Sequence, residues 1–190
     1  MGGRVRLKPS TLNATVTRMK SSPAVRQASN PAKQLAFFIA KFEPATARVM
    51  RQCRIELRKL LPKANELVYD NYNFFVIGFS PTERPSDTIV SLVAAANGVG
   101  LSFYHGADLP DPQHLLLGDG KQNRFVRLPT AGVLRSPGVR ALIRAAIAQA
   151  RQQLPKNGGS KLVIRSVSAK QRPRRRKKIG TVSRPPTKRR

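Results

Sequence analysis

Histidine and aspartate side chains, which are common metal ligands, gather in one stretch of this sequence. Within residues 105–119 they are His105, Asp108, Asp111, His114 and Asp119. Their imidazole and carboxylate groups are suited to a metal ion, but their spacing is neither that of a helix nor that of a zinc finger. The string Asp-Leu-Pro-Asp-Pro is also typical of a turn, because Asp side chains bond nearby amides and Pro fixes φ. The spacing favours a turn between two strands, and a metal site at His105, Asp108, Asp111 and His114 stays as the alternative.

The same residues do not form a recognisable catalytic motif. A His–Asp pair needs a nucleophile beside it, and the chain has no G-x-S-x-G elbow. The single cysteine, Cys53, lies on the apolar stripe of a predicted helix, which is typical of a core residue. Residues 118–121 end like a phosphate-binding P-loop, but they lack its first glycine and its Ser or Thr. We therefore predict no catalytic residue and favour a non-enzymatic binding protein.

Two further clusters predict ligand contacts. Lys121, Arg124 and Arg127 follow a Gly-rich bend, where cations and free amides together suit a small anion. Side chains alternate along a strand, so Arg127 is expected to share one face with Phe125, and Arg124 the other. Tyr69, Asp70 and Tyr72 form a second, polar–aromatic cluster beside a bend, which is typical of a pocket rim or of core packing with outward hydroxyls.

Charge is distributed very unevenly along the 190 residues. The net charge is +27, and all nine acidic residues lie between Glu43 and Asp119. Both ends lack apolar periodicity, which predicts a disordered basic tail at 1–30, a folded domain at 31–154 and a disordered basic tail at 155–190. Acid-free basic tails neutralise phosphates without reading sequence. We expect non-specific contact with nucleic acid or another polyanion through Arg172, Arg174, Arg175, Arg176, Lys177, Lys178, Lys188, Arg189 and Arg190.

The elements that must position these residues are readable from periodicity. Helices are predicted from Asn30, from Glu43 to Pro62 and from Ser136 to Pro155, with about five short strands between 66 and 128. Asn97-Gly98 predicts a two-residue hairpin turn. The strands are too close in sequence for parallel crossovers. We therefore predict an α+β fold, an antiparallel sheet with the N-terminal and C-terminal helices packed on it.

Three stretches of the sequence resemble the YdhG-like domain family, whose function is unknown. They run from Phe37 to Asp87, from Leu101 to Leu128 with its Gly-Ala-Asp-Leu-Pro-Asp-Pro string, and from Val139 to Ala150. The resemblance covers about residues 34–151. It implies a compact α+β domain of broadly frataxin-like architecture, and iron handling by analogy with some relatives. It offers no catalytic residues, and no cofactor is predicted beyond that iron.

Three functions follow as hypotheses: a binding protein whose tails contact polyanions, an iron- or metal-handling protein, and an enzyme or binder acting on a small anion. No apolar run reaches the roughly 18 residues that a membrane span requires, so no membrane partner is expected. The lone cysteine and the lack of an apolar leader favour a cytoplasmic location.

Overall fold

The computed structural model describes residues 30–175 as three helices and a six-stranded sheet. The helices are α1 (Pro31–Ala40), α2 (Pro44–Leu60) and α3 (Pro137–Ala148). The strands are β1 (Asn65–Asp70), β2 (Phe75–Ser80), β3 (Val90–Ala95), β4 (Gly98–Phe103), β5 (Arg124–Arg127) and β6 (Leu162–Val167). Short 3-10 turns, among them η2 (Pro85–Asp87) and η4 (Ala131–Arg135), connect them.

Each helix begins where proline and capping residues permit it. Pro31, Pro44 and Pro137 occupy the first turns of α1, α2 and α3, where a missing amide costs nothing. The Asn30 side chain accepts hydrogen bonds from the amides of Ala32 and Lys33, at 2.9 and 3.4 Å, and so caps α1.

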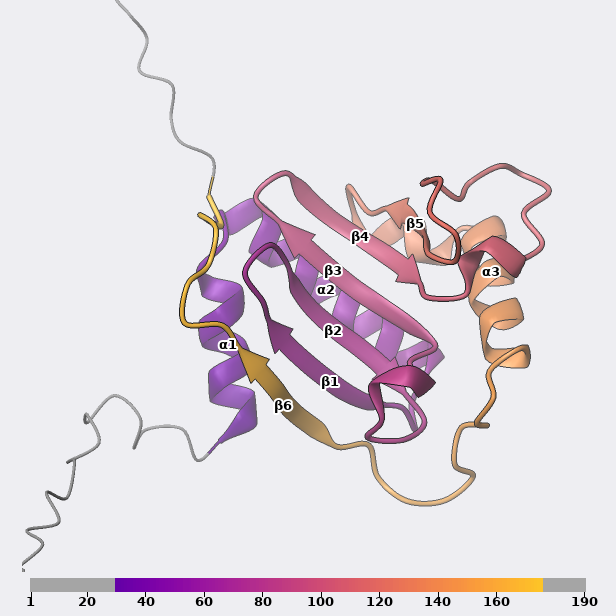
Figure 1. Cartoon of the computed structure of the whole chain (residues 1–190), viewed down its shortest axis with the longest axis horizontal. Coiled ribbons are helices and arrows are strands. Elements are labelled where there is room, and N and C mark those ends of the chain that lie inside the picture. The colour runs from indigo at the N-terminus through magenta and orange to yellow at the C-terminus, as the bar shows by residue number, and fades with distance from the viewer. Residues whose placement is uncertain (1–29, 176–190) are drawn as a thin grey trace, which may run out of the picture.

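The sheet has the strand order β5-β4-β3-β2-β1-β6 (Figure 1). The first five strands pair antiparallel, and a two-residue turn joins β3 to β4 at Ala96-Asn97, one position before the predicted Asn97-Gly98, while Gly98 pairs with Ala95 at a positive φ of 135°. β6 pairs with β1 in parallel. The α+β prediction is therefore confirmed, while the prediction of a purely antiparallel sheet of about five strands is wrong.

The sixth strand also corrects the predicted domain boundary. Residues 155–190 were expected to be a disordered tail, yet Leu162–Val167 pair along the whole of β1. Leu162 and Ile164 pack against the core, and Arg174 is buried. The fold therefore extends to residue 175, because this segment supplies apolar side chains to the core and a paired strand to β1. Its basic composition does not indicate either contribution. Residues 1–29 and 176–190 lie outside the described residues.

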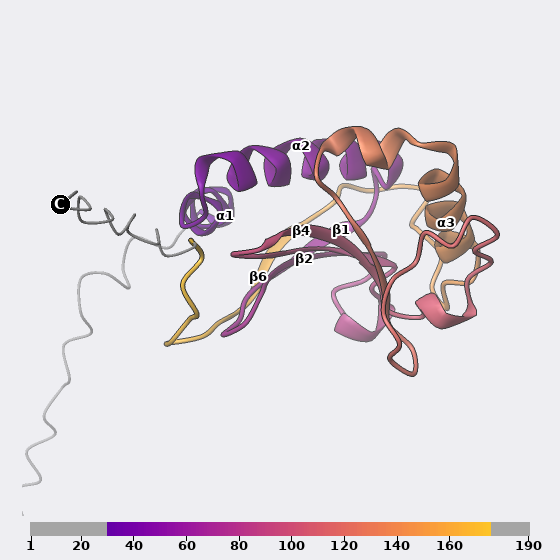
Figure 2. The ribbon, with the colours of Figure 1, turned by 90° about the horizontal axis from the view of Figure 1, so that it is seen from above.

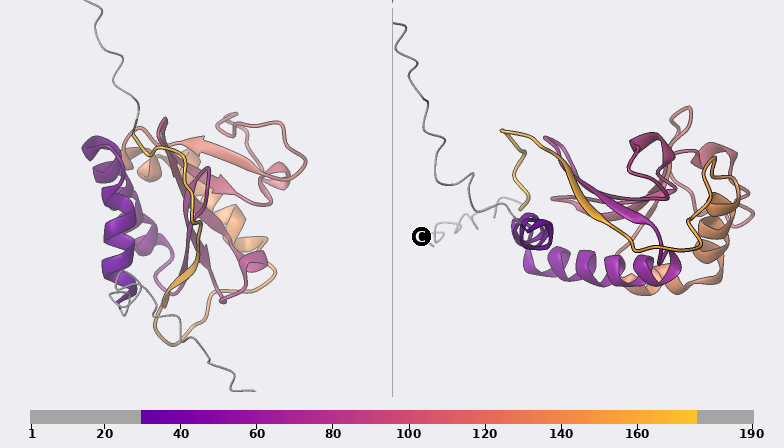
Figure 3. Two further views of the ribbon diagram at one scale, coloured as in Figure 1. Left: turned by 60° about the vertical axis from the view of Figure 1, so that its left-hand side comes forward. Right: turned by 90° about the horizontal axis from the view of Figure 1, so that it is seen from below.

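The core lies between the sheet and its helices. α1 and α2 both lie on one face of the sheet, as Figures 2 and 3 show, and α2 contacts β3 and β4. α3 lies at the end of the sheet beside residues 105–115, where the Gln149 side chain bonds the His105 carbonyl at 3.0 Å. Its buried residues join the same core, and they are Val139, Leu142, Ile143 and Ala146. Over residues 30–175, no helix has the length and apolarity to cross a membrane.

Candidate functional site

Strand alternation gives the sheet a second face that α1 and α2 leave open. On β3, Val90, Leu92 and Ala94 are buried toward the helices, and the side chains between them point the other way. β4 repeats this pattern, with Leu101 and Phe103 in the core. Small residues therefore line the open face at the centre of the sheet: Gly78, Ser91, Ala95, Gly100 and Ser102.

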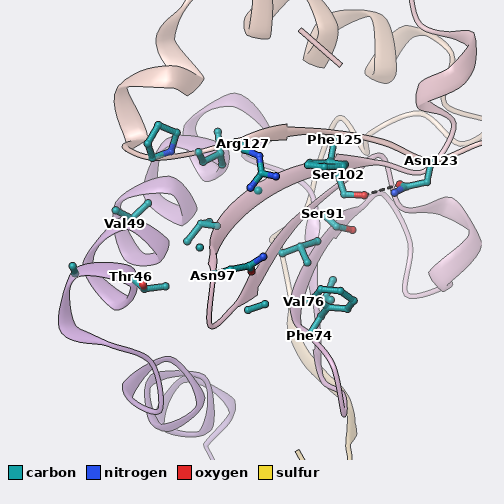
Figure 4. A pocket seen from close by; sticks show the side chains of 18 residues that line it. Thr46, Val49, Phe74, Val76, Ser91, Asn97, Ser102, Asn123, Phe125 and Arg127 are labelled. Atoms are coloured by element: carbon teal, nitrogen blue, oxygen red, sulfur yellow. Dashed lines mark hydrogen bonds between the residues drawn. The ribbon is translucent and has the colours of Figure 1, made fainter. Parts of the chain in front are cut away.

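A hollow of about 860 Å³ occupies much of this open face, and we call it the sheet pocket (Figure 4). β2, β3, β4 and β5 supply its floor, and α2 adds Thr46 and Val49 beyond the tip of the β3–β4 hairpin. Val76 and Val93, which are cross-strand partners, lie in the floor. The sheet pocket is therefore built from segments that are far apart in the sequence.

Two aromatic rings and one cation give the sheet pocket its chemical character. Phe74 and Phe125 line it, and the guanidinium carbon of Arg127 lies 6.0 Å from the centroid of the Phe125 ring. The backbone of Phe125 is fixed on its second side by Leu117, through hydrogen bonds of 2.8 and 3.0 Å. Arg127 and Phe125 share one strand face, as alternation predicts, and Val126 enters the core on the other.

Arg127 is the one charged side chain that lines the sheet pocket, all of whose lining residues are described. The polar groups around it are uncharged. Ser102 donates a hydrogen bond to the Asn123 side-chain oxygen at 2.7 Å, and Ser91 and Asn97 lie nearby. The lining includes no carboxylate, imidazole or thiol, so it offers an anion contact and an apolar floor but no general acid or base that could activate its Ser and Thr hydroxyls.

The predicted cationic cluster is only partly brought together. Arg127 lines the sheet pocket, whereas Lys121 and Arg124 do not. Arg124 donates to the backbone carbonyls of Gly120 and Asn123, the second at 2.9 Å, and so braces its own loop. Lys121 is exposed on that loop. The structure therefore does not bring all three cations to one hollow, and Arg127 alone of the three lines the sheet pocket.

The predicted cluster of Tyr69, Asp70 and Tyr72 is divided among three environments. Asp70 is buried and pairs with Lys41 at 2.6 Å and with Arg174 at 2.9 Å. Tyr69 points to the opposite side of β1, and its buried hydroxyl has no hydrogen-bond partner within residues 30–175. Burial raises the pKa of Tyr69, and the positive charge of Arg165 opposes that shift. Tyr72 lies 50% exposed in the β1–β2 turn. The three side chains therefore do not form one pocket rim.

The predicted metal ligands adopt the turn alternative. The Asp111 carboxylate accepts hydrogen bonds from the amides of Leu115 and Leu116, at 3.0 and 2.8 Å. His114 has a φ of 51°, which tightens the same turn. His105 and Asp108 line a smaller hollow of about 250 Å³ elsewhere on the surface. Among residues 30–175, no three His, Cys, Asp or Glu side chains converge as a metal ion requires, so the predicted set is not assembled.

Cys53 is a core residue, as its position on the helix predicts. It is fully buried in α2, and burial together with the Glu56 carboxylate raises the pKa of its thiol to about 11. A thiol that stays protonated at neutral pH is a poor nucleophile.

The structure describes three of the residues predicted to contact nucleic acid. Arg172 and Arg175 are exposed, but the Arg174 side chain is only 4% exposed. Its prediction as a polyanion contact is wrong, because its guanidinium is committed to Asp70 and to backbone carbonyls. The other predicted contacts lie outside the described residues: Arg176, Lys177, Lys178, Lys188, Arg189 and Arg190.

Sequence reasoning missed most of the sheet pocket. The alternation of Ser91, Val93 and Ala95 with buried neighbours was a usable signal for one small-residue strand face. Nothing local indicated that Thr46, Phe74 and Phe125 would line the same hollow. Comparison of the chain with known families, curated proteins and solved structures finds no match, so the YdhG-like resemblance stays a prediction.

Proposed function

We propose that this chain is a binding protein whose sheet pocket holds a small molecule with a flat apolar body and one anionic group. The observation that carries the proposal is Arg127, a lone cation in a largely apolar, uncharged lining. Small-molecule sites commonly have this composition and volumes of roughly 300–1,000 Å³. The volume of about 860 Å³ falls in that range.

The chemistry of the lining selects the ligand class. A guanidinium binds carboxylate, sulfonate or phosphate oxygens with two parallel hydrogen bonds. Phe125 lies next to Arg127, and a neighbouring apolar ring strengthens such a contact by reducing the local dielectric constant. Phe74, Val76 and Val93 offer area to an apolar ring system. Because the lining has no general acid or base that could activate its hydroxyls, binding rather than catalysis is the favoured role.

A dye that combines naphthalene and aniline rings with one sulfonate, anilinonaphthalene sulfonate, is a suitable probe. We expect saturable fluorescence enhancement with the native protein, and at least about tenfold weaker binding for Arg127→Ala, the loss of one charged contact. Arg140→Ala, which removes an exposed arginine of α3, is the matched control and should bind as the native protein does. Equal dye affinity for all three proteins would remove Arg127 from the site and contradict the proposal.

A second candidate, association with polyanions, has its own support. Residues 30–175 contain 23 Lys and Arg against nine Asp and Glu. Four of these acids, Glu56, Glu66, Glu83 and Asp70, are already in ion pairs. Exposed arginines of α2 and α3 make no ion pair within the described part of the chain, and they are Arg48, Arg51, Arg140 and Arg144. The folded part therefore adds exposed positive charge to that of the basic tails. Binding to labelled DNA and RNA that weakens steeply with added salt would support this candidate, and salt-independent binding would contradict it.

A further inference from the structure

Two aromatic rings project at the end of the sheet where β1 turns into β2. Tyr72 and Phe74 are 50% and 49% exposed, although rings of this size are usually packed. A hydrogen bond of 3.0 Å from the Asn71 amide to the Phe74 carbonyl closes the turn that carries them. The rings are therefore held at the surface by a defined turn.

The segment that follows β6 brings Arg172 to the Tyr72 ring and Arg175 to the end of α1. It passes over the β1–β2 turn and the end of α1, at the upper left of Figure 1. The Arg172 amide donates to the Tyr72 carbonyl at 2.9 Å, and the Arg172 guanidinium carbon lies 5.7 Å from the Tyr72 ring centroid. On the other side of the segment, Arg175 donates to the carbonyls of Lys41 and Ala40, at 3.3 and 3.4 Å. We call the surface formed by Tyr72, Phe74, Arg172 and Arg175 the turn patch.

Asp70 does not oppose the charge of the turn patch. Asp70, the acidic residue at the base of the turn, is 1% exposed and is neutralised by Lys41 and Arg174. Arg174 also donates to the carbonyls of Asn71 and Asn73, at 2.5 and 2.9 Å, which fixes the segment to the turn. In the sequence, Arg176, Lys177 and Lys178 continue directly from Arg175. The turn patch therefore combines exposed rings with positive charge that the Asp70 carboxylate does not neutralise.

We infer that the turn patch binds single-stranded nucleic acid, with bases stacked on Tyr72 and Phe74 and phosphates held by Arg172 and Arg175. This inference rests on the proposed polyanion association and gives it a defined site. Bases of a single strand expose their faces to aromatic side chains, whereas those of a duplex are already stacked on one another. An acidic peptide would satisfy the arginines, but it would leave the two rings without a partner. The pairing of rings with cations therefore favours an unpaired strand.

Fluorescence anisotropy of the full chain tests this inference with labelled oligouridine and oligothymidine of about 15 nucleotides, a length near known single-strand site sizes. A duplex of the same length is the comparison. We expect both single strands to bind more tightly than the duplex, and Tyr72→Ala to weaken single-strand binding about five- to tenfold. Tyr72→Phe keeps the ring and should bind normally. Arg172→Ala should reduce the slope of log K against log salt by about 0.7, the loss of one phosphate contact.

Tyr104→Ala is the matched control, because Tyr104 is also exposed, at 53%, but follows β4 at the opposite end of the sheet. It should bind single strands as the native protein does.

Normal binding by Tyr72→Ala, or equal affinity for duplex and single strand, would overturn the turn patch while leaving polyanion association intact. Displacement by polyglutamate as effective as that by the unlabelled strand would also overturn it. No binding of any nucleic acid near about 0.1 M salt would contradict both proposals. Phe74 also lines the sheet pocket, but Arg127 does not belong to the turn patch, so Arg127→Ala should leave strand binding unchanged.

Discussion

The guanidinium of Arg174 and the carboxylate of Asp70 form an ion pair of 2.9 Å in which the two side chains are only 4% and 1% exposed. The partners lie 104 positions apart in the sequence. Arg174 also lies over the Phe42 ring, at 5.6 Å from its centroid. Arg174 therefore anchors the last described segment to the turn between β1 and β2 and to the connection between α1 and α2.

Removal of Arg174 should destabilise the protein. Breaking one partner of a buried pair leaves an uncompensated charge and costs about 3–5 kcal/mol. We expect Arg174→Ala to lower the free energy of unfolding by about 3 kcal/mol, near the low end of that range, because Lys41 still neutralises Asp70. Urea unfolding measures the change, with Arg172→Ala as the exposed control. Similar free energies of unfolding for the two variants would show that the buried pair does not stabilise the fold.

The Cys53 thiol predicts a dependence of stability on alkaline pH. Its folded-state pKa of about 11 lies above the ordinary 9.0, since burial disfavours the thiolate. The stability contributed by the neutral thiol is therefore complete below pH 9 and is lost as the pH rises toward about 11. The free energy of unfolding of the native protein should fall more steeply across that window than that of Cys53→Ala. Parallel curves for the two proteins would contradict the predicted shift.

Filling the sheet pocket should block its ligand without disturbing the core. Ser91 lies on the open face next to its cross-strand neighbour Ser102, and both residues line the sheet pocket. We expect Ser91→Leu to change the free energy of unfolding by less than about 1 kcal/mol. Its affinity for anilinonaphthalene sulfonate should fall at least about tenfold, since the side chain takes ligand volume.

The control for Ser91→Leu is Ser86→Leu, at an exposed position in η2 outside the sheet pocket. Ser86→Leu should therefore bind the dye as the native protein does, while Ser91→Leu binds it much more weakly. If Ser91→Leu binds the dye as tightly as Ser86→Leu does, the dye occupies another surface.

His114 should be replaceable by glycine with a gain in stability. Its φ of 51° is unfavourable for residues with a Cβ, by about 1–2 kcal/mol, and glycine removes that cost. Glycine also makes the unfolded chain more flexible, so we expect a net gain of about 0.5–1 kcal/mol in thermal or urea unfolding. His114→Ala retains the Cβ and should show no gain. A loss of stability in His114→Gly would instead assign the imidazole a structural or ligand role.

The strands and helices that depend on local pattern were predictable from the sequence. The proline and asparagine starts of α1 and the alternation of Phe125 with Val126 are local features, and both appear in the structure. The predicted hairpin turn also appears, but at Ala96-Asn97, one position before Asn97-Gly98. β6 was missed because its short apolar run lies in an acid-free basic segment and pairs in parallel with β1, about 95 residues earlier. Composition alone therefore described 155–175 wrongly.

The candidate sites were less predictable, because they depend on contacts between distant segments. Arg127 was singled out correctly beside Phe125, but Thr46, Phe74 and Val93 join it only through the folded sheet. Asp70 was assigned to a pocket rim because its burial under Lys41 and Arg174 is not visible in the local sequence. Side-chain type indicated the chemistry, and the fold determined which groups meet.

A methyl NMR titration of the full chain with 1-naphthoic acid, an aromatic carboxylate, tests the sheet pocket most directly. We predict that the methyl signals of Val76 and Val93 shift and saturate together, while the chemical shifts of Val139 in the α3 core and Val163 on β6 do not change. The same titration of Arg127→Ala should produce shifts only at much higher ligand concentration. Unmoved Val76 and Val93 signals, or equal shifts in the native and Arg127→Ala proteins, would contradict the assignment of the sheet pocket as an anion-selective binding site.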